Sequence, residues 1–289
     1  MLRLAILKNG KQSILLIVLL YFTFFIRKLS LVNSTSSFLC KNTLISRRKG
    51  NTMQYFGGKQ RISKQLSQYL NSQLKDDQPF VDLFCGSCNI ITKIDNNRVR
   101  IANDKHKYLI TMWKALQDGW IPPDEISRRE YEFIRKNKDD APHLTGFVGF
   151  GCSFAGKWFG GYAYNSKGDN YCSRSKKGCI NKLSYLNDVE FYNLNYDELN
   201  IPKGSLVYCD IPYKGTTPYC KEEVGTFNYD EFYQWARDNS SIYDVYISEY
   251  KDNIPEDFEI VWEMESRKCI RNAKNEAVRT TEVLIKYKG

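Results

Sequence analysis

The sequence predicts an α/β fold built on a mostly parallel sheet. Short apolar segments at residues 80–84, 99–102 and 205–209 have β character, and each ends at a polar or Gly-containing turn. Residues 62–74 and 106–117 carry apolar side chains at helical spacing. Such an alternation of strands and helices is typical of a parallel sheet covered by helices.

The last third of the chain continues this pattern. Residues 230–237 predict a helix, and residues 245–248, 258–262 and 282–287 predict three more strands. Strands are therefore expected to continue to the end of the chain.

Residues 128–195, called the insert below, interrupt the pattern. They include a stretch crowded with Gly and aromatic residues, and residues 128–182 hold eleven Lys or Arg against five Asp or Glu. We predict that the insert is a small domain of a different kind, and that residues 53–127 and 196–289 together form the sheet domain.

The positive net charge of the chain, +9, lies entirely in residues 1–52. These hold nine Lys or Arg and no Asp or Glu, which leaves 33 basic and 33 acidic residues in the rest. Residues 13–26 form an apolar run that is shorter than the ~20 residues needed to span a bilayer comfortably. Three interpretations stay open: a membrane anchor, a targeting presequence, or upstream sequence with the true start at Met53. We favour the third, because recognisable motifs begin two residues after Met53.

The nine cysteines have no repeating spacing, which does not resemble a disulfide framework and indicates a reducing, intracellular compartment. Cys85 and Cys88 form one Cys-x-x-Cys pair, but a zinc site requires four ligands. Both histidines, His106 and His143, are isolated in the sequence. We interpret the cysteine pair as small buried residues at a strand end and predict no metal site.

The turn after residues 80–84 has the form expected for binding a nucleoside cofactor. Gly86 lets the backbone approach a ligand closely because it has no Cβ. Asp104 follows the next strand, 22 positions after Asp82, where an acidic residue can bind ribose hydroxyls. The alternative is a tight turn without a ligand.

A second motif, Asp210-Ile211-Pro212-Tyr213, lies at the end of another predicted strand. The Asp210 carboxylate and the Ile211 carbonyl can each accept one N–H of an amine that is conjugated to a ring, which favours a tetrahedral nitrogen. Pro212 fixes the backbone, and Tyr213 offers a ring on which a base can stack. The alternative is an Asp-x-Pro turn after a buried strand.

A third motif lies at the start of the sheet domain. Tyr55-Phe56-Gly57-Gly58-Lys59 places two glycines and a Lys before a helix, where an anion such as a phosphate or a carboxylate can bind. The alternative is a flexible turn with a solvated Lys.

Taken together, the three motifs resemble the Dam-type family of DNA adenine methyltransferases, and most closely its phage and bacterial forms, which include enzymes of restriction-modification. The resemblance covers nearly all of residues 53–289. It implies a Rossmann-like methyltransferase sheet with one antiparallel edge strand, S-adenosylmethionine as cofactor, and transfer of its methyl group to N6 of a flipped adenine in double-stranded DNA. An intracellular, DNA-associated location is expected on the same ground. A membrane association is expected only if residues 1–52 are present in the mature protein. No obligate protein partner is evident.

The resemblance also assigns roles to single residues. The cofactor ligands it implies are Tyr55, Gly57, Gly58, Lys59, Asp82, Phe84, Gly86, Asp104 and Asp210. The catalytic residues are Asp210, Ile211, Pro212 and Tyr213. Two departures from the family pattern exist: Cys88 stands where the turn usually has Gly, and Ile211 stands where the tetrapeptide usually has Pro. A Cβ at Cys88 could crowd the cofactor if the backbone requires a positive φ.

The insert is the part expected to read DNA. The basic residues expected to contact phosphates are Lys157, Arg174, Lys176, Lys177 and Lys182. Three aromatic residues, Trp158, Phe159 and Tyr162, either pack the insert or wedge into the duplex, and we favour packing. Other functions stay open: a methyltransferase of RNA or of protein glutamine, or a degenerate methylase that binds DNA without catalysis.

Overall fold

The computed structural model describes residues 53–165, 168–214, 221–271 and 277–289. The interpretations of residues 1–52 therefore lie outside the described part. The described residues belong to one compact unit. None of the helices in the described ranges is both long enough and apolar enough to span a membrane.

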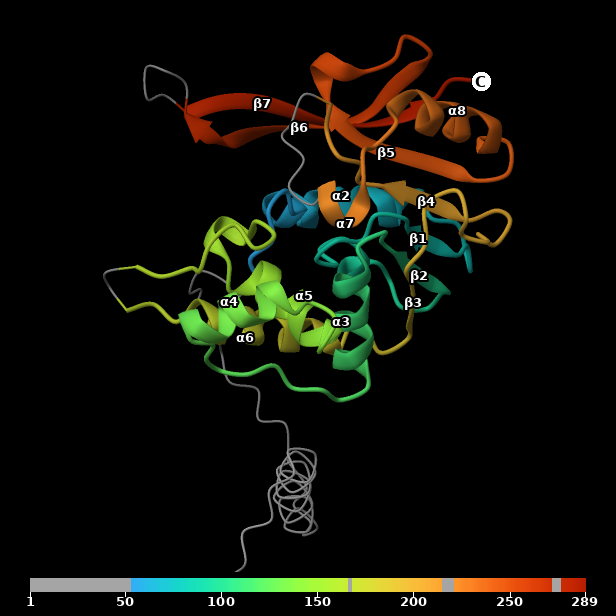
Figure 1. Cartoon of the computed structure of the whole chain (residues 1–289). Coiled ribbons are helices and arrows are strands. Elements are labelled where there is room, and N and C mark those ends of the chain that lie inside the picture. Colours follow the sequence, from blue (N-terminus) through green and yellow to red (C-terminus); the bar gives the residue numbers. More distant parts are fainter. Residues whose placement is uncertain (1–52, 166–167, 215–220, 272–276) are drawn as a thin grey trace, which may run out of the picture. The chain divides into compact units, whose positions relative to one another are not determined.

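Seven strands form a single sheet in the order β3-β2-β1-β4-β5-β7-β6 (Figure 1). Strands β1 to β5 pair in parallel, and β7 is antiparallel to both β5 and β6. The predicted α/β class with a Rossmann-like, mostly parallel sheet is therefore confirmed. The strands are β1 Phe80–Asp82, β2 Arg100–Asn103, β3 Val189–Tyr192, β4 Leu206–Cys209, β5 Asp244–Tyr250, β6 Phe258–Arg271 and β7 Ala277–Tyr287.

The position of the antiparallel strand differs from the expectation. The resemblance implied that this strand lies at the sheet edge, but β7 lies second from the edge, between β5 and β6. Only residues 272–276 separate β6 from β7, and strands joined by so short a connection can pair only in the antiparallel direction. The edge strand is β6, which pairs with β7 alone.

Helices cover both faces of the sheet, because successive strand residues point to opposite sides. Phe80, Leu206 and Tyr208 pack in one apolar core with α2, α3, α5 and α6. Their neighbours Val81 and Val207 pack in a second core with α8. The helices are α2 Ser63–Gln73, α3 Lys107–Gln117, α4 Arg128–Lys136, α5 Pro142–Gly151, α6 Tyr171–Leu183, α7 Lys221–Val224 and α8 Tyr229–Asn239, with short 3-10 helices at Lys59–Arg61, Ile91–Lys93, Phe154–Gly156 and Lys251–Asn253.

The insert contributes to the sheet as well as to its cover. Strand β3 lies within residues 128–195 and pairs in parallel with β2. Sequence analysis missed this strand, which has four residues and alternates between buried and exposed positions. The three helices of the insert, α4, α5 and α6, precede it, and α5 packs against α3 through the backbone of Gly146.

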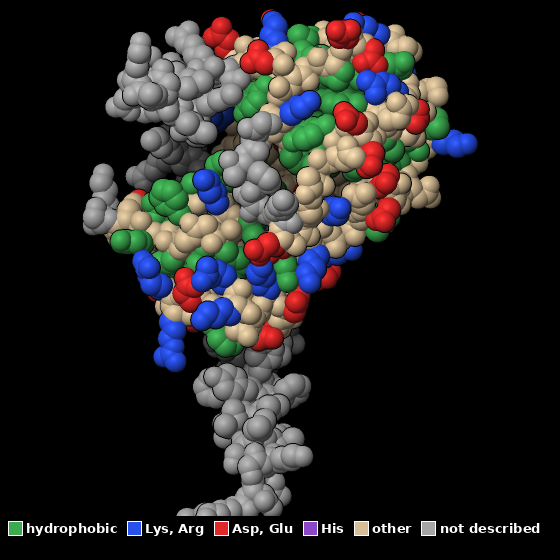
Figure 2. Space-filling model, turned by 45° about the horizontal axis from the view of Figure 1, so that its top comes forward, with side chains coloured by type: hydrophobic (Ala, Val, Ile, Leu, Met, Phe, Trp, Pro, Cys, Tyr) green, Lys and Arg blue, Asp and Glu red, His purple; other side chains and the backbone are tan. Residues whose placement is uncertain are grey.

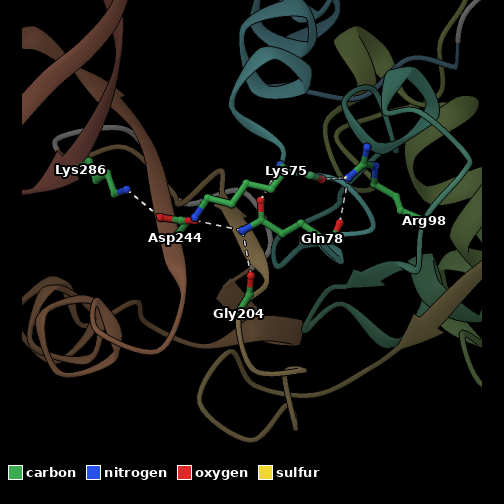
Figure 3. A network of polar contacts seen from close by, with 6 residues as sticks. All are labelled: Lys75, Gln78, Arg98, Gly204, Asp244 and Lys286. Atoms are coloured by element: carbon green, nitrogen blue, oxygen red, sulfur yellow. Dashed lines mark hydrogen bonds and ion pairs between the residues drawn. The ribbon is translucent and has the colours of Figure 1, made fainter.

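A polar network ties together the amino ends of the parallel strands (Figure 3). Asp244, the first residue of β5, accepts hydrogen bonds from Lys286 Nζ at 2.9 Å and from Gln78 Nε2 at 2.9 Å. Gln78 Nε2 also donates to the carbonyl of Gly204, before β4, at 2.8 Å, and Arg98 donates to the carbonyl of Gln78 at 3.0 Å. This network lies at the edge opposite the predicted site.

Asp244→Asn should destabilise the protein at neutral pH and have less effect in acid. Partial burial alone would raise the pKa of Asp244, but hydrogen bonds from Lys286 and Gln78 hold that pKa below its usual range. The carboxylate therefore contributes stability above the unfolded-state pKa of about 4, and this contribution is lost as pH falls through the lower folded-state pKa. We expect a loss of about 1 kcal/mol at pH 7, since the network is partly exposed.

Urea unfolding of the native protein and of Asp244→Asn between pH 7 and about pH 3 measures this difference. The exposed Asp76 provides a control, and Asp76→Asn should not change the unfolding free energy. A difference between native protein and Asp244→Asn that stays constant as pH falls would contradict the role of the ionised carboxylate.

Candidate active site

Three carboxylates lie together at the carboxyl ends of neighbouring strands. Asp82 ends β1, Asp104 follows β2, and Asp210 follows β4. The sheet places β1 between β2 and β4, with Asp82 opposite Ala102 and Tyr208. Sequence positions that are far apart therefore meet at one edge, where α/β proteins bind their ligands.

The turn after β1 is held against this edge by backbone hydrogen bonds. The Gly86 N–H donates to Asp104 Oδ2 at 2.9 Å, and the Trp113 indole N–H donates to the Gly86 carbonyl at 3.0 Å. Gly86 has φ +47°, and a Cβ there would lie 3.0 Å from the ring of Tyr55. The turn therefore requires Gly at this position for both its conformation and its packing.

Cys88, the departure from the family pattern, adopts the conformation that usually favours Gly. Its φ is +56°, and its side chain is completely buried. A left-handed conformation costs a residue with a Cβ about 1–2 kcal/mol. Cys85 and Cys88 are free, buried thiols, in agreement with their interpretation as small core residues.

The Tyr55–Lys59 motif lies between the turn and the insert. The Phe56 N–H donates to the Gly156 carbonyl at 2.9 Å, and the ring of Tyr55 lies 4.8 Å from that of Phe150. Gly57 has φ +79°, and a Cβ on Gly58 would lie 3.1 Å from the side-chain nitrogen of Asn89. The two glycines thus allow the chain to turn close to the turn after β1.

Lys59 connects this motif with the tetrapeptide that follows β4. Its ammonium is buried and lies 2.5 Å from Asp210 Oδ1, across 151 residues of sequence. The same nitrogen lies 3.7 Å from Glu282 Oε2 and 4.3 Å from the centre of the Tyr213 ring. One cation therefore contacts two groups that follow the end of β4 and a third that lies within β7.

Tyr213 is enclosed rather than open. Its hydroxyl donates to Glu282 Oε2 at 3.1 Å, and its ring lies 4.3 Å from that of Tyr250. Ile211 packs in the core that α8 covers, whereas Pro212 is exposed. The tetrapeptide is thus anchored by Ile211 and Tyr213, on either side of the exposed Pro212.

Burial sets the electrostatics of the three carboxylates. It raises the pKa of Asp82 well above the usual value, and the nearby charge of Asp210 raises it further. Burial also raises the pKa of Asp210 and of Asp104, but Lys59 opposes the shift at Asp210, and the N–H groups of His106 and Gly86 oppose it at Asp104. Asp82 Oδ1 is buried and has no hydrogen-bond partner among the described residues. A buried carboxylate oxygen of this kind can accept a hydrogen bond from a ligand.

Phe84 has a packing role in the structure. Its ring lies 6.0 Å from Tyr196 and 5.7 Å from Phe232, in the core that α8 covers. Phe84 therefore anchors the turn after β1 in the core that α8 covers.

Sequence analysis missed two acidic residues of the site, Glu282 on β7 and Glu249 on β5. Glu249 is completely buried, and burial raises its pKa while the N–H of Tyr250 and the side chain of Asn253 oppose the shift. An acidic residue within an otherwise apolar strand was the available signal, because a buried carboxylate requires a partner. No group of three or more His, Cys, Asp or Glu that could hold a metal occurs in the described ranges.

The basic residues proposed for DNA binding differ in their surroundings. Lys157 and Lys177 are exposed, whereas Arg174 lies 3.5 Å from Asp169 and Lys176 lies 2.7 Å from Asp124. Figure 2 shows one face of the molecule with Lys and Arg side chains gathered at its lower part, interspersed with acidic ones.

Lys182 is not available for a phosphate contact, and that prediction was wrong. Its side chain is buried and donates hydrogen bonds to Ser87 and Asn89. Trp158 is also buried, with its ring 4.3 Å from that of His106, which supports the interpretation of this aromatic residue as a packing residue.

A comparison with protein families matches part of the chain. Residues 55–141 match the family model described as D12 class N6 adenine-specific DNA methyltransferase. No curated protein matches the chain. The matched residues include the Tyr55–Lys59 motif, the turn after β1 and Asp104, whereas Asp210 and the insert beyond residue 141 lie outside the match. The resemblance to adenine-specific DNA methyltransferases that the motifs indicated is confirmed over residues 55–141.

Proposed function

We propose that this chain is an S-adenosylmethionine-dependent methyltransferase that methylates N6 of adenine in double-stranded DNA. The observation that carries the proposal is the contact between Lys59 and Asp210, which joins two motifs 151 residues apart at the carboxyl edge of the sheet. The family match over residues 55–141 supports the same chemistry.

The residues at this edge fit the chemical groups of S-adenosylmethionine, which supplies a methyl group on a positively charged sulfur. Asp104 follows β2, where an acidic residue can accept hydrogen bonds from ribose hydroxyls. The unpartnered oxygen of Asp82 suits the amino group of the methionine part. Lys59 suits its carboxylate, and the acidic surroundings favour a cationic ligand.

Asp210 and Ile211 act on the amine of adenine in this proposal. The Asp210 carboxylate and the Ile211 carbonyl each accept one N–H, which stabilises the tetrahedral nitrogen of the transition state more than the planar ground state. The Lys59 ammonium helps to keep Asp210 ionised in spite of its burial. This pairing makes the carboxylate available as an acceptor at neutral pH.

A flipped adenine would stack on Tyr213. Since Lys59 and Tyr250 cover this ring, we expect the base to displace at least one of them as it enters. Unpairing and unstacking a base costs about a few kcal/mol, and stacking of the flipped base on Tyr213 would offset part of this cost. The basic residues of the insert, including the exposed Lys157 and Lys177, would hold the duplex by its phosphates.

Transfer of labelled methyl groups from S-adenosylmethionine to unmethylated DNA tests the proposal, with digestion to identify the modified nucleoside. We expect N6-methyladenine from the native chain and a rate at least ~10²-fold lower for Asp210→Ala, because one transition-state acceptor is lost. The exposed Asp76 supplies the matched control, and Asp76→Ala should keep full activity.

A folded protein that binds the cofactor but transfers no methyl group to DNA would contradict the proposal. Transfer to RNA or to protein glutamine in the same assay would then identify a different methyltransferase. Binding of DNA without any transfer would identify a degenerate methylase.

A further inference from the structure

Lys182 is a buried cation that the proposed chemistry does not use. It lies near the end of α6, in the insert, and its Nζ donates to the Ser87 carbonyl and, at 2.8 Å, to Asn89 Oδ1. Its Nζ also lies 5.7 Å from the centre of the Trp113 ring. Burial lowers the pKa of Lys182, as expected for an ammonium withdrawn from water.

The two acceptors belong to the turn after β1, residues 83–89, which is called the cofactor turn below because the proposed function assigns it to S-adenosylmethionine. Ser87 and Asn89 follow Gly86, and the Asn89 side-chain nitrogen donates to Ser87 Oγ at 2.9 Å. A Cβ on Gly58 would lie 3.1 Å from the same nitrogen of Asn89, so Gly58 packs directly on this pair. Lys182 is thus connected through Asn89 and Gly58 with the backbone beside Lys59.

Helix α6 also carries basic residues that we propose for DNA binding. Arg174, Lys176 and Lys177 are partly or fully exposed, whereas Lys182 on the same helix is directed into the protein. Burying an ammonium costs free energy unless it is hydrogen-bonded, so packing by itself favours an apolar side chain at a buried position. A packing role alone therefore does not require an ammonium at this position, whereas fixing two polar groups of the turn does.

We propose that Lys182 is a positioning residue through which α6 of the insert sets the conformation of the cofactor turn, so that DNA and cofactor bind with mutual dependence. This inference rests on the proposed function. Binding coupling is reciprocal: if DNA bound along α6 favours the turn conformation that Lys182 holds, the cofactor favours DNA binding by the same factor.

Calorimetric binding of S-adenosylhomocysteine to the full chain, with and without a DNA duplex, tests this inference. We expect DNA to raise the cofactor affinity of the native protein by about fivefold or more. Lys182→Met should weaken cofactor binding by about tenfold, because two charge-assisted hydrogen bonds are lost. It should also reduce the effect of DNA to less than twofold, while DNA affinity without cofactor stays unchanged. A merely structural role would not change the coupling of a folded protein.

Lys114→Met on α3 is the control. Because Lys114 is exposed and is assigned no role in binding, this change should leave both the cofactor affinity and the effect of DNA unaltered. If Lys182→Met does not fold, Asn89→Ala provides the second variant. It removes one acceptor and keeps the contact with Ser87, and it should produce the same two changes to a smaller extent.

The outcomes separate the two proposals. Native protein that does not bind S-adenosylhomocysteine would overturn the proposed function and, with it, this inference. Native protein that binds it, together with variants whose affinity and coupling equal those of the native protein, would overturn the role of Lys182 and leave the proposed function intact.

Discussion

Lys59→Met should abolish most methyl transfer at neutral pH. Part of the activity of this variant should return as pH rises. Lys59 is the cation that opposes the burial-induced rise in the pKa of Asp210, and Glu282 raises this pKa further. Without Lys59 the pKa of Asp210 therefore moves higher, and a protonated carboxyl is a weaker acceptor for the adenine N–H that Asp210 is assigned. We expect kcat/KM to fall by at least ~10²-fold at pH 7.

The pH dependence distinguishes this effect from general damage. The activity of Lys59→Met relative to the native protein should increase between pH 7 and about pH 9, since a raised carboxyl pKa is exceeded only at higher pH. Lys64 is exposed on α2, and Lys64→Met is the control, with activity equal to the native protein at every pH. If the activity of Lys59→Met relative to the native protein does not change with pH, this explanation is wrong. Such a result would indicate that Lys59 acts by binding the cofactor directly.

Gly146→Ala should strongly destabilise the contact between the insert and the sheet domain. A Cβ on Gly146 would lie 2.1 Å from the carbonyl oxygen of Tyr108 and 3.0 Å from Cβ of Met112. The first neighbour is helix backbone, which cannot rotate away, so α5 and α3 must separate. Ala gains about 1 kcal/mol of helix propensity over Gly, but we expect the clash to win and to lower the unfolding free energy by about 3 kcal/mol.

Gly119→Ala supplies a comparison with the same chemical change. No atom lies within 4 Å of a Cβ built there, and the φ of +89° leaves only conformational strain, which should cost about 1–2 kcal/mol. Urea unfolding of both variants measures the two effects separately. Equal losses for the two substitutions would show that the contact between α3 and α5 is looser than this geometry requires.

The sequence alone determined where six of the seven strands lie, at least in part, and which motifs stand at the strand ends. Apolar segments marked these strands, whereas β3 alternates between buried and exposed residues and has no apolar run. The motifs at residues 55–59, 82–86 and 210–213 were recognisable because turn and ligand chemistry restrict residue types locally. Their assembly at one edge was predictable from parallel pairing, since the carboxyl ends of parallel strands lie on the same side.

Tertiary structure alone decided which residues from distant parts of the sequence contact these motifs. The pairing of Lys59 with Asp210, the contact of Glu282 with Tyr213, and the burial of Lys182 against Ser87 all join residues that lie far apart in the sequence. A Lys on an amphipathic helix has the same local pattern whether it faces solvent or the core. Only the packing of α6 against the turn after β1 determines that Lys182 is buried while Lys177 remains exposed. This packing depends on contacts that no local sequence pattern specifies.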